Sequence, residues 1–178
     1  PLTILLSPIM LLVAFAIKCC DGGPVFYRQV RCTKDNREFS ILKFRSMIVD
    51  AEKSGEAVLA KEHDERITPV GRFLRAVRLD ELPQLFNVLS GDMSLVGPRP
   101  ERPEIIAEYQ KEMPEFVFRT RVKAGVTGFA QIYGKYNTVP YDKLKLDLFY
   151  IENYSLWMDL KLILMTVKTV LKKDSTEG

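Results

Sequence analysis

The feature that most constrains this chain is its first 17 residues, PLTILLSPIMLLVAFAI, which carry no charge. Thirteen of the 17 are hydrophobic. As a helix they would reach about 25 Å, short of a bilayer core of about 30 Å. The basic segment and the small-residue cleavage site of a signal peptide are both missing from this stretch. The run therefore predicts a helix in contact with a membrane.

Ser7 and Pro8 interrupt the middle of this run. Proline lacks a backbone donor and clashes with the preceding turn, so a helix bends or stops there. A serine hydroxyl can satisfy the carbonyl that proline leaves free, which makes a bend tolerable in lipid. We interpret the run as a helix that enters the membrane, bends at Ser7 and Pro8, and leaves on the same side. The end of a spanning helix and a buried core helix remain as alternatives.

The composition of the chain limits the classes of protein to which it can belong. The 178 residues are 47% hydrophobic, which fits one folded domain and excludes a disordered or collagen-like chain. A net charge of only +3 argues against a surface devoted to nucleic acid, so we expect no nucleic-acid partner. The three cysteines form no C-x-x-C pair and there is one histidine, which argues against a disulfide framework or a zinc site. Because the first residue is Pro, we expect the chain to be part of a longer protein.

Two strand-like stretches, 24–31 and 37–45, follow the apolar run and are joined through Lys34, Asp35 and Asn36. Asn and Asp tolerate the backbone geometry of tight turns, so a β-hairpin is expected. The next residues, 46–66, predict a polar helix and a charged loop on the surface. Thr68 and Pro69 then predict a helix start, with Thr68 as the N-cap.

That helix carries Arg72, Arg75 and Arg78 three residues apart, which predicts that they share one side. Three cations at this spacing repel one another unless an anion lies nearby. The arrangement therefore indicates an anion site. A solvated basic face is the alternative.

Asp80 and Glu81 are the strongest candidates for functional residues. Pro83 can occupy only the first turn of a helix, so a new helix is expected to begin near Asp80 and to end at Gly91. Both carboxylates would then stand at a helix N-terminus, where Asp and Glu commonly serve as caps. The neighbouring arginines, including Arg99, instead favour a site that holds a divalent metal and phosphates. The hydrophobic residues of this helix predict one buried stripe, made of Leu82, Leu85, Phe86 and Leu89.

Three later segments complete the chain. Residues 101–113 predict a helix that ends at Pro114, and 124–128 predict a glycine-rich turn that matches no standard nucleotide loop. Residues 155–173 predict a helix with an apolar stripe, where Trp157 and several lysines suit a membrane surface. A core helix with a basic outer face is the alternative. The stripe is Leu156, Leu160, Ile163, Leu164, Val167, Val170 and Leu171, and the lysines are Lys161, Lys168, Lys172 and Lys173.

Taken together, these stretches resemble the bacterial sugar transferases, the monotopic polyprenyl-phosphate phosphoglycosyl transferases. The matching motifs are LKFRSM (42–47), RITPVG (66–71), RLDELPQLFNVLSGDMSLVGPRP (78–100), KAGVTGFAQIYGKY (123–136) and YIENYSLWMDLKLILMT (150–166). They occur in the family's order. Members of the family also carry a basic start and more apolar sequence before the Ser-Pro pair, which this sequence does not contain.

The resemblance implies an α+β, mostly helical fold with a re-entrant membrane helix, a small β-hairpin and amphipathic interfacial helices. Residues 1–178 would form one catalytic domain. Within it, 1–18 would be the re-entrant helix, 19–173 the cytoplasmic and interfacial catalytic part, and 174–178 a tail. The implied location is the cytoplasmic face of the bacterial cytoplasmic (inner) membrane.

The resemblance also implies a Mg²⁺-dependent reaction. A nucleoside-diphosphate sugar, such as a UDP-sugar, would give its sugar 1-phosphate to undecaprenyl phosphate and release the nucleoside monophosphate. This reaction starts the synthesis of exopolysaccharide, capsule, O-antigen or glycoconjugates. Asp80 would be the nucleophile and a metal ligand, with Glu81 as its catalytic partner. The expected phosphate contacts are Lys43, Arg45, Arg78 and Arg99, and a homodimer is among the expected partners.

Two other functions remain open at this point. A glycosyltransferase would release the nucleoside diphosphate instead, although the sequence has no separate Asp-x-Asp metal motif to support it. A non-catalytic scaffold would use the apolar start and the last helix to dock on a membrane, and would need Asp80 and Glu81 only as helix caps.

Overall fold

The computed structural model describes residues 2–49, 51, 64–134 and 138–171. The α-helices are α1 Leu2–Asp21, α2 Pro69–Ala76, α3 Gln84–Leu89, α4 Pro103–Glu112, α5 Phe129–Tyr133, α6 Pro140–Asn153 and α7 Leu156–Leu171. Short 3-10 helices are η1 Lys34–Asn36, η2 Leu79–Glu81 and η3 Pro114–Arg121. The strands are β1 Phe26–Cys32, β2 Glu38–Phe44, β3 Ser94–Val96 and β4 Gly125–Thr127. The mostly helical α+β fold is confirmed.

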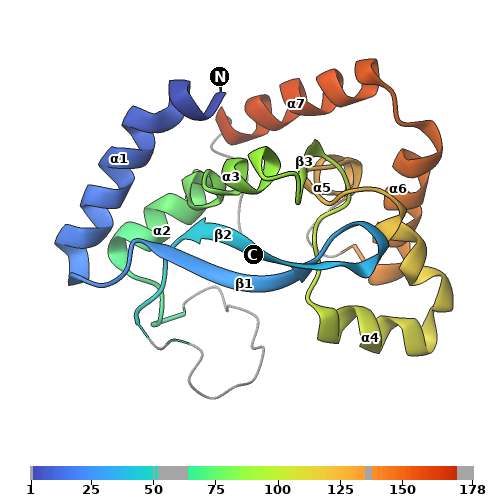
Figure 1. Cartoon of the computed structure of the whole chain (residues 1–178), viewed down its shortest axis with the longest axis horizontal. Helices are drawn as coiled ribbons and strands as arrows, with labels where there is room; N and C mark the ends of the chain where they lie inside the picture. Colours follow the sequence, from blue (N-terminus) through green and yellow to red (C-terminus); the bar gives the residue numbers. More distant parts are fainter. Residues whose placement is uncertain (1, 50, 52–63, 135–137, 172–178) are drawn as a thin grey trace.

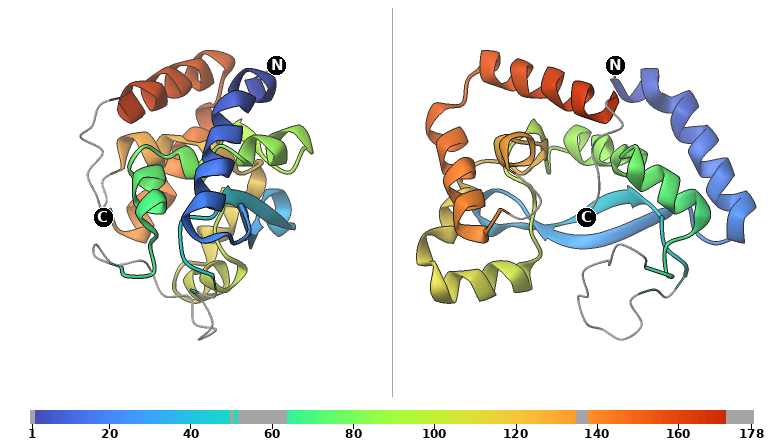
Figure 2. Two further views of the ribbon diagram at one scale, coloured as in Figure 1. Left: turned by 90° about the vertical axis from the view of Figure 1, so that its left-hand side faces the viewer. Right: turned by 180° about the vertical axis from the view of Figure 1, so that it is seen from behind.

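The elements are arranged around the β1–β2 hairpin, as Figure 1 shows. Helices α2 and α3 lie along one side of the hairpin and α4 lies on the other. Helix α1 stands at one end of the molecule and α6 at the other, with α7 crossing the top. The first turn of α1 and the last turn of α7 overlap in Figure 1, but the left view of Figure 2 shows them on opposite sides of the molecule.

The hairpin is antiparallel and pairs Phe26 with Phe44 at its open end and Cys32 with Glu38 at its turn. Asp35 and Asn36 adopt left-handed backbone conformations, with φ of 56° and 58°. These are the residue types that tolerate such angles at least cost. The predicted hairpin is therefore confirmed together with its turn.

Helix α1 runs from Leu2 to Asp21 without a break at Pro8. The hydroxyl of Ser7 donates a hydrogen bond to the carbonyl of Ile4 at 2.7 Å. That carbonyl is the one whose usual partner, the N–H of residue 8, is missing in proline. One stripe of α1 is buried and packs against Phe44 and Leu74, namely Met10, Val13 and Ile17. Leu6 is half-buried, and the other large hydrophobic side chains of α1 are exposed.

Helix α2 begins as predicted, because the Thr68 hydroxyl accepts a hydrogen bond from the N–H of Gly71 at 2.9 Å. It ends at Ala76, and Arg78 has a left-handed backbone with φ 54° and ψ 22°. Arg78 has therefore left the helix. The expectation that it shares one helical side with Arg72 and Arg75 is wrong.

The buried stripe predicted for the following helix is confirmed for Leu82 and Leu85, which contact the core, and is wrong for Phe86 and Leu89. Phe86 and Leu89 are 44% and 64% exposed, and the buried residues of α3 are Gln84, Leu85 and Asn87. Asn87 faces inward because it pairs with the edge of β2. Its Oδ1 accepts from the Leu42 N–H and its Nδ2 donates to the Ser40 carbonyl, both at 2.9 Å.

The predicted glycine-rich turn contains a strand. Residues Gly125–Thr127 form β4, which pairs in parallel with β3 (Ser94–Val96). Glycine is needed where these two segments of backbone meet, because a Cβ on Gly97 would lie 2.4 Å from the Lys123 carbonyl oxygen. The glycines therefore allow close approach between backbones, and a ligand is not required to explain them.

Helix α7 packs into the core through Leu162, which is buried with Tyr150 and Val96. The predicted apolar stripe lies largely on its outer face, where Leu156, Leu160, Leu164 and Val167 are exposed. Lys172 and Lys173 are outside the described residues, as are the side chains of Val170 and Leu171. Most of the surface helix predicted within 46–66 is outside them as well.

Candidate active site

Asp80 and Glu81 lie on the short helix η2, between α2 and α3. The left-handed backbone of Arg78 turns the chain out of α2. The N–H of Glu81 then donates a hydrogen bond to the Arg78 carbonyl at 3.3 Å. Leu79 and Leu82 flank the pair and pack against the buried cluster that contains Phe44 and Leu74. Apolar anchors on both sides therefore hold the two carboxylates beside strand β2.

Glu81 is the centre of a charged cluster. Its Oε1 accepts from Lys43 Nζ at 3.1 Å and from Arg99 Nη2 at 3.0 Å. Lys43 is on β2 and Arg99 is on the loop after β3. Burial by itself raises the pKa of Glu81, but the charges of Arg99 and Lys43 outweigh it and hold that pKa well below its usual range. Glu81 is therefore a firmly ionised carboxylate that draws two cations together.

Asp80 is different, because its carboxylate makes no hydrogen bond or ion pair within the described part of the chain. Neither η2 nor α3 has a side-chain cap, so the interpretation of Asp80 and Glu81 as helix caps does not hold. Burial raises the pKa of Asp80, and the charge of Glu81 raises it further. Asp80 thus presents two free oxygens in a partly buried place beside three cations, Lys43, Arg75 and Arg99.

Arg45 and Arg78, the other two predicted phosphate contacts, have different surroundings. The guanidinium of Arg45 is buried, holds Asp21 with two nitrogens, and also donates to the carbonyls of Pro24 and Met47. It joins the end of α1 to the end of β2, and its role in phosphate binding stays a prediction. Arg78 is exposed. Of the predicted phosphate contacts, the structure brings Lys43 and Arg99 together at Glu81.

A second layer of charged residues lies behind Arg99 and was not predicted from the sequence. Arg119 on η3 donates to Asp147 Oδ2 on α6 from Nε and Nη2, at 3.1 and 2.8 Å. Its Nη2 also donates to the backbone carbonyl of Arg99 at 3.0 Å. The charge of Asp147 could have predicted such a pair, because Leu144, Asp147 and Tyr150 share the buried face of α6 and only Asp147 is charged. A carboxylate at a core position needs a cation, and Arg119 supplies it.

A divalent metal would find few protein ligands here. No group of three or more His, Cys, Asp or Glu side chains suited to a metal occurs among the residues that the structure describes. Mg²⁺ is commonly held by one or two carboxylates together with substrate phosphates, rather than by a complete protein cage. The free oxygens of Asp80 fit that arrangement.

The sequence is similar to a group of known proteins. Residues 1–173 match the family described as bacterial sugar transferase. The chain is 44% identical over 170 residues to a UDP-N-acetylgalactosamine-undecaprenyl-phosphate N-acetylgalactosaminephosphotransferase of Aeromonas hydrophila, covering 94% of this chain and 40% of the relative. It is 45% identical over 169 residues to a UDP-glucose:undecaprenyl-phosphate glucose-1-phosphate transferase of Klebsiella pneumoniae, covering 92% and 36%.

A shorter relative aligns over more of its own length. The UDP-glucose:undecaprenyl-phosphate glucose-1-phosphate transferase of Caulobacter vibrioides is 43% identical over 179 residues, covering 98% of this chain and 67% of the relative. The chain thus spans two fifths or less of the first two relatives and about two thirds of the third.

Proposed function

The chain belongs to the bacterial sugar transferase family, and from this we propose that it transfers a sugar 1-phosphate from a UDP-sugar to undecaprenyl phosphate. The nucleoside monophosphate is released. The reaction would be the first step in making an exopolysaccharide, capsule, O-antigen or glycoconjugate. The observation that carries the proposal is the unpaired carboxylate of Asp80 next to the doubly paired carboxylate of Glu81.

Asp80 acts as the nucleophile in this proposal. One of its oxygens attacks the phosphorus that bears the sugar, and the bond from that phosphorus to the bridging oxygen of the diphosphate breaks. The electron pair leaves with the nucleoside monophosphate, and an aspartyl phospho-sugar remains. A phosphate oxygen of the lipid then attacks the same phosphorus and frees Asp80. Two half-reactions at one carboxylate avoid holding all the phosphate charges in the site at once.

Lys43 and Arg99 stabilise the charge on the transferring phosphoryl group. Both are already held near Asp80 by Glu81, so little reorganisation is needed when phosphate arrives. Mg²⁺, bound by Asp80 and the diphosphate oxygens, would offset further negative charge. Glu81 is then the partner that keeps the cations in place, and Arg45 and Arg78 remain candidates for the outer phosphate contacts.

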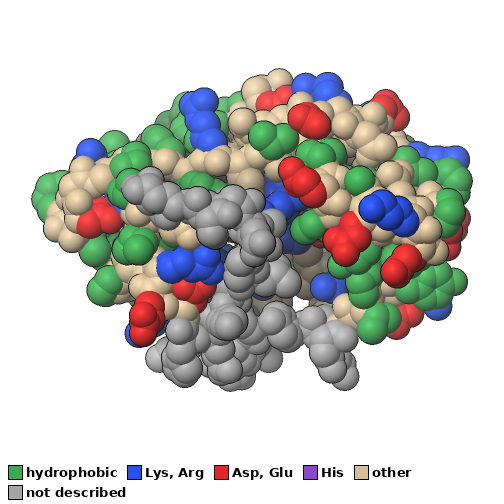
Figure 3. Space-filling view, turned by 90° about the horizontal axis from the view of Figure 1, so that it is seen from below, with side chains coloured by type: hydrophobic (Ala, Val, Ile, Leu, Met, Phe, Trp, Pro, Cys, Tyr) green, Lys and Arg blue, Asp and Glu red, His purple; other side chains and the backbone are tan. Residues whose placement is uncertain are grey.

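The membrane part of the proposal rests on α1 and α7. Helix α1 is long and apolar enough to cross a membrane, with a mean hydropathy of 2.2 and 17% of that stretch buried. Helix α7, which crosses the top of the molecule in Figure 1, also exposes large apolar side chains, whereas the face seen from below carries acidic and basic side chains side by side (Figure 3). We propose that 1–18 form a re-entrant helix and that α7 rests in the cytoplasmic interface of the inner membrane. Residues 19–173 would form the catalytic part.

The partners follow from the reaction. They are undecaprenyl phosphate, a UDP-sugar and the membrane, with no nucleic acid. The relatives named above differ in the sugar that they transfer, so a panel of UDP-sugars is needed to identify it. A homodimer stays a prediction.

The test is nucleotide release by purified protein with undecaprenyl phosphate, Mg²⁺ and the panel of UDP-sugars. We expect UMP with at least one sugar, no UMP without Mg²⁺, and none from Asp80→Asn. Release of UDP would instead indicate a glycosyltransferase that breaks the sugar–phosphate bond. No release with any sugar would favour a membrane-docked scaffold.

A further inference from the structure

We propose that Arg119 is a positioning residue that holds Arg99 in place, through the backbone of the 97–101 loop, for binding the phosphates of the nucleotide sugar. The inference rests on the proposed function. It assigns a task to the buried pair of Arg119 and Asp147, which the proposed reaction does not use directly.

The 97–101 loop has no regular secondary structure, yet every carbonyl from Pro98 to Glu101 accepts a hydrogen bond. The donors come from other parts of the fold. They are Gly125 N–H to Pro98 at 2.9 Å, Arg119 Nη2 to Arg99 at 3.0 Å, Arg31 Nη1 to Pro100 at 3.2 Å, and Cys32 N–H to Glu101 at 2.9 Å. A loop bound at four successive peptides has little freedom to move.

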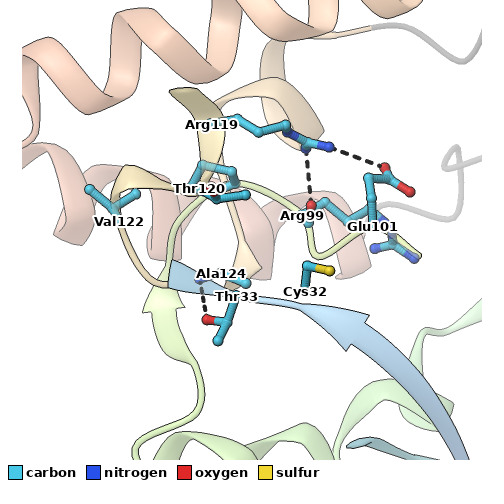
Figure 4. Close-up of a pocket in the computed structure, with 9 residues that line it drawn as sticks. Cys32, Thr33, Arg99, Glu101, Arg119, Thr120, Val122 and Ala124 are labelled. Carbon is cyan, nitrogen blue, oxygen red and sulfur yellow. Dashed lines mark hydrogen bonds and ion pairs between the residues drawn. The ribbon is translucent and has the colours of Figure 1, made fainter. Parts of the chain in front are cut away.

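Arg119 makes the bond that bears directly on Arg99. Its side chain is 7% exposed and that of Asp147 is 2% exposed, so the pair is shielded from water and from screening by salt. Arg119 Nη1 also lies 3.6 Å from Glu101 Oε1, and its guanidinium stacks 4.9 Å from the centre of the Phe116 ring. Figure 4 shows Arg119 pointing toward both Arg99 and Glu101.

The space between the loop and η3 is small. A cavity of about 10 Å³ lies between the loop and η3, lined by Cys32, Arg99 and Arg119 among others. This is about the room that one water molecule needs. The bond from Arg119 holds the Arg99 carbonyl on this side of the loop, and the Arg99 side chain extends to Glu81, whose Oε1 it reaches at 3.0 Å. Arg119 thus supports one of the two cations at Glu81 from the buried side.

Replacing Arg119 alone would leave Asp147 buried without a cation, which can prevent folding. The test variant is therefore Arg119→Gln with Asp147→Asn, which removes both charges. We expect it to fold, and its kcat/KM for UMP release to fall by about tenfold to a hundredfold, as for other supporting residues. The matched control is Arg37→Gln. Arg37 also binds an aspartate, Asp92, but at the exposed hairpin turn, so its loss should leave kcat/KM unchanged.

A double-mutant cycle separates positioning from general destabilisation. If Arg119 acts through Arg99, adding the paired change to Arg99→Ala should lower kcat/KM almost no further. Two results would overturn the proposal. One is a paired change that lowers kcat/KM by the same factor in the Arg99→Ala background as in the wild-type protein. The other is a paired variant with wild-type kcat/KM. If the paired variant does not fold, Arg119→Lys decides. It keeps the charge but not the planar fork, so we expect a folded protein whose kcat/KM falls several-fold, and wild-type kcat/KM would overturn the proposal.

Failure of the proposed function would look different. In that case the wild-type protein itself would release no UMP, and the positioning role would be tested by UDP binding in the same variants. A UDP affinity that falls in the paired variant, and does not fall further when Arg99 is also Ala, would support it. An unchanged UDP affinity in the paired variant would overturn it.

Discussion

Asp80 and Glu81 are adjacent residues whose carboxylates have opposite surroundings. Glu81 accepts hydrogen bonds from Lys43 and Arg99 at 3.1 and 3.0 Å, whereas Asp80 has no partner among the described residues. Burial and the charge of Glu81 raise the pKa of Asp80, while the two cations lower the pKa of Glu81. One carboxylate is thus paired with two cations, and the other has no partner among the described residues.

Asp80→Asn should abolish turnover while the protein stays folded. The amide keeps the shape of the side chain but is a poor nucleophile, so UMP release should fall by about a thousandfold or more. Because Asp80 has no partner to lose, the free energy of unfolding in urea should change by only about 0.5 kcal/mol. Near-normal turnover in this variant would rule Asp80 out as the nucleophile.

The covalent intermediate can be tested in the wild-type protein. Radiolabelled sugar phosphate should stay on the protein when undecaprenyl phosphate is withheld, and Asp80→Asn should retain none. Steady-state kinetics should follow a ping-pong pattern, since UMP leaves before the lipid phosphate enters. Intersecting lines without retained label would indicate direct transfer between the two substrates.

Glu81→Gln should affect binding and turnover in opposite directions. The substitution releases Lys43 and Arg99 from a competing anion, so inorganic phosphate and UMP should bind more tightly. Turnover should fall, because the two cations are no longer held in place. Titration calorimetry and UMP release measure the two effects, and Glu81→Asp is the control that keeps the charge. A loss of phosphate affinity in Glu81→Gln would show that Glu81 does not compete with phosphate for Lys43 and Arg99.

Activity should depend on pH through Asp80. The ionised form reacts, so kcat/KM should fall as the pH drops through a pKa that lies above the ordinary aspartate value of 3.8. The charge of Arg75 lowers this pKa. Arg75→Gln should therefore move the acid limb of the profile to higher pH, and more so at low salt. Arg72→Gln on the same helix is the control, and an equal shift in both variants would contradict the assignment.

Local chemistry explains which parts of the fold could be predicted. Asp35 and Asn36 suit the hairpin turn by themselves, and Thr68 with Pro69 defines the start of α2 within four residues. The membrane-like character of α1 is visible in its composition. In each case the residues that decide the structure are neighbours in the sequence.

The features that could not be predicted depend on distant partners. Asn87 is buried because it pairs with β2, more than 40 residues earlier, and this turned Phe86 outward against the hydrophobic pattern. Arg119 and Asp147 are 28 residues apart, and the sequence does not show that they meet behind Arg99. The candidate site itself was found through its motif, whereas the structure was needed to show that Glu81 pairs with Lys43 and Arg99 while Asp80 has no partner among the described residues.

Asn87→Asp should lower stability more than its small chemical change suggests. The carboxylate could still accept from the Leu42 N–H, but it would face the Ser40 carbonyl with an acceptor in place of a donor. An unmet buried polar group costs about 1–3 kcal/mol, and burying the charge adds to this. Urea unfolding measures the effect. Asn153→Asp, at an exposed helical position where Nδ2 donates to the Phe149 carbonyl, should cost much less.

The two ends of α1 should both lie on the cytoplasmic side of the membrane. Ser7 satisfies the Ile4 carbonyl that Pro8 leaves free, so the helix can carry a proline within lipid at little cost. Cys19 and Cys20 are exposed at the far end of α1, and Cys32 is buried. In intact cells, a membrane-impermeant thiol reagent should fail to label Cys19 and Cys20. It should equally fail to label a cysteine at position 2 in a Cys19→Ser/Cys20→Ser background.

Both sites should be labelled once inverted vesicles expose the cytoplasmic face. Pro8→Leu is the informative control, because it restores the backbone donor and removes the reason for a bend. In that variant a fraction of the molecules should span the membrane, and the cysteine at position 2 should then become accessible in intact cells. Labelling of this cysteine from the outside without the Pro8 change would mean that α1 spans the membrane, and the re-entrant helix would have to be abandoned.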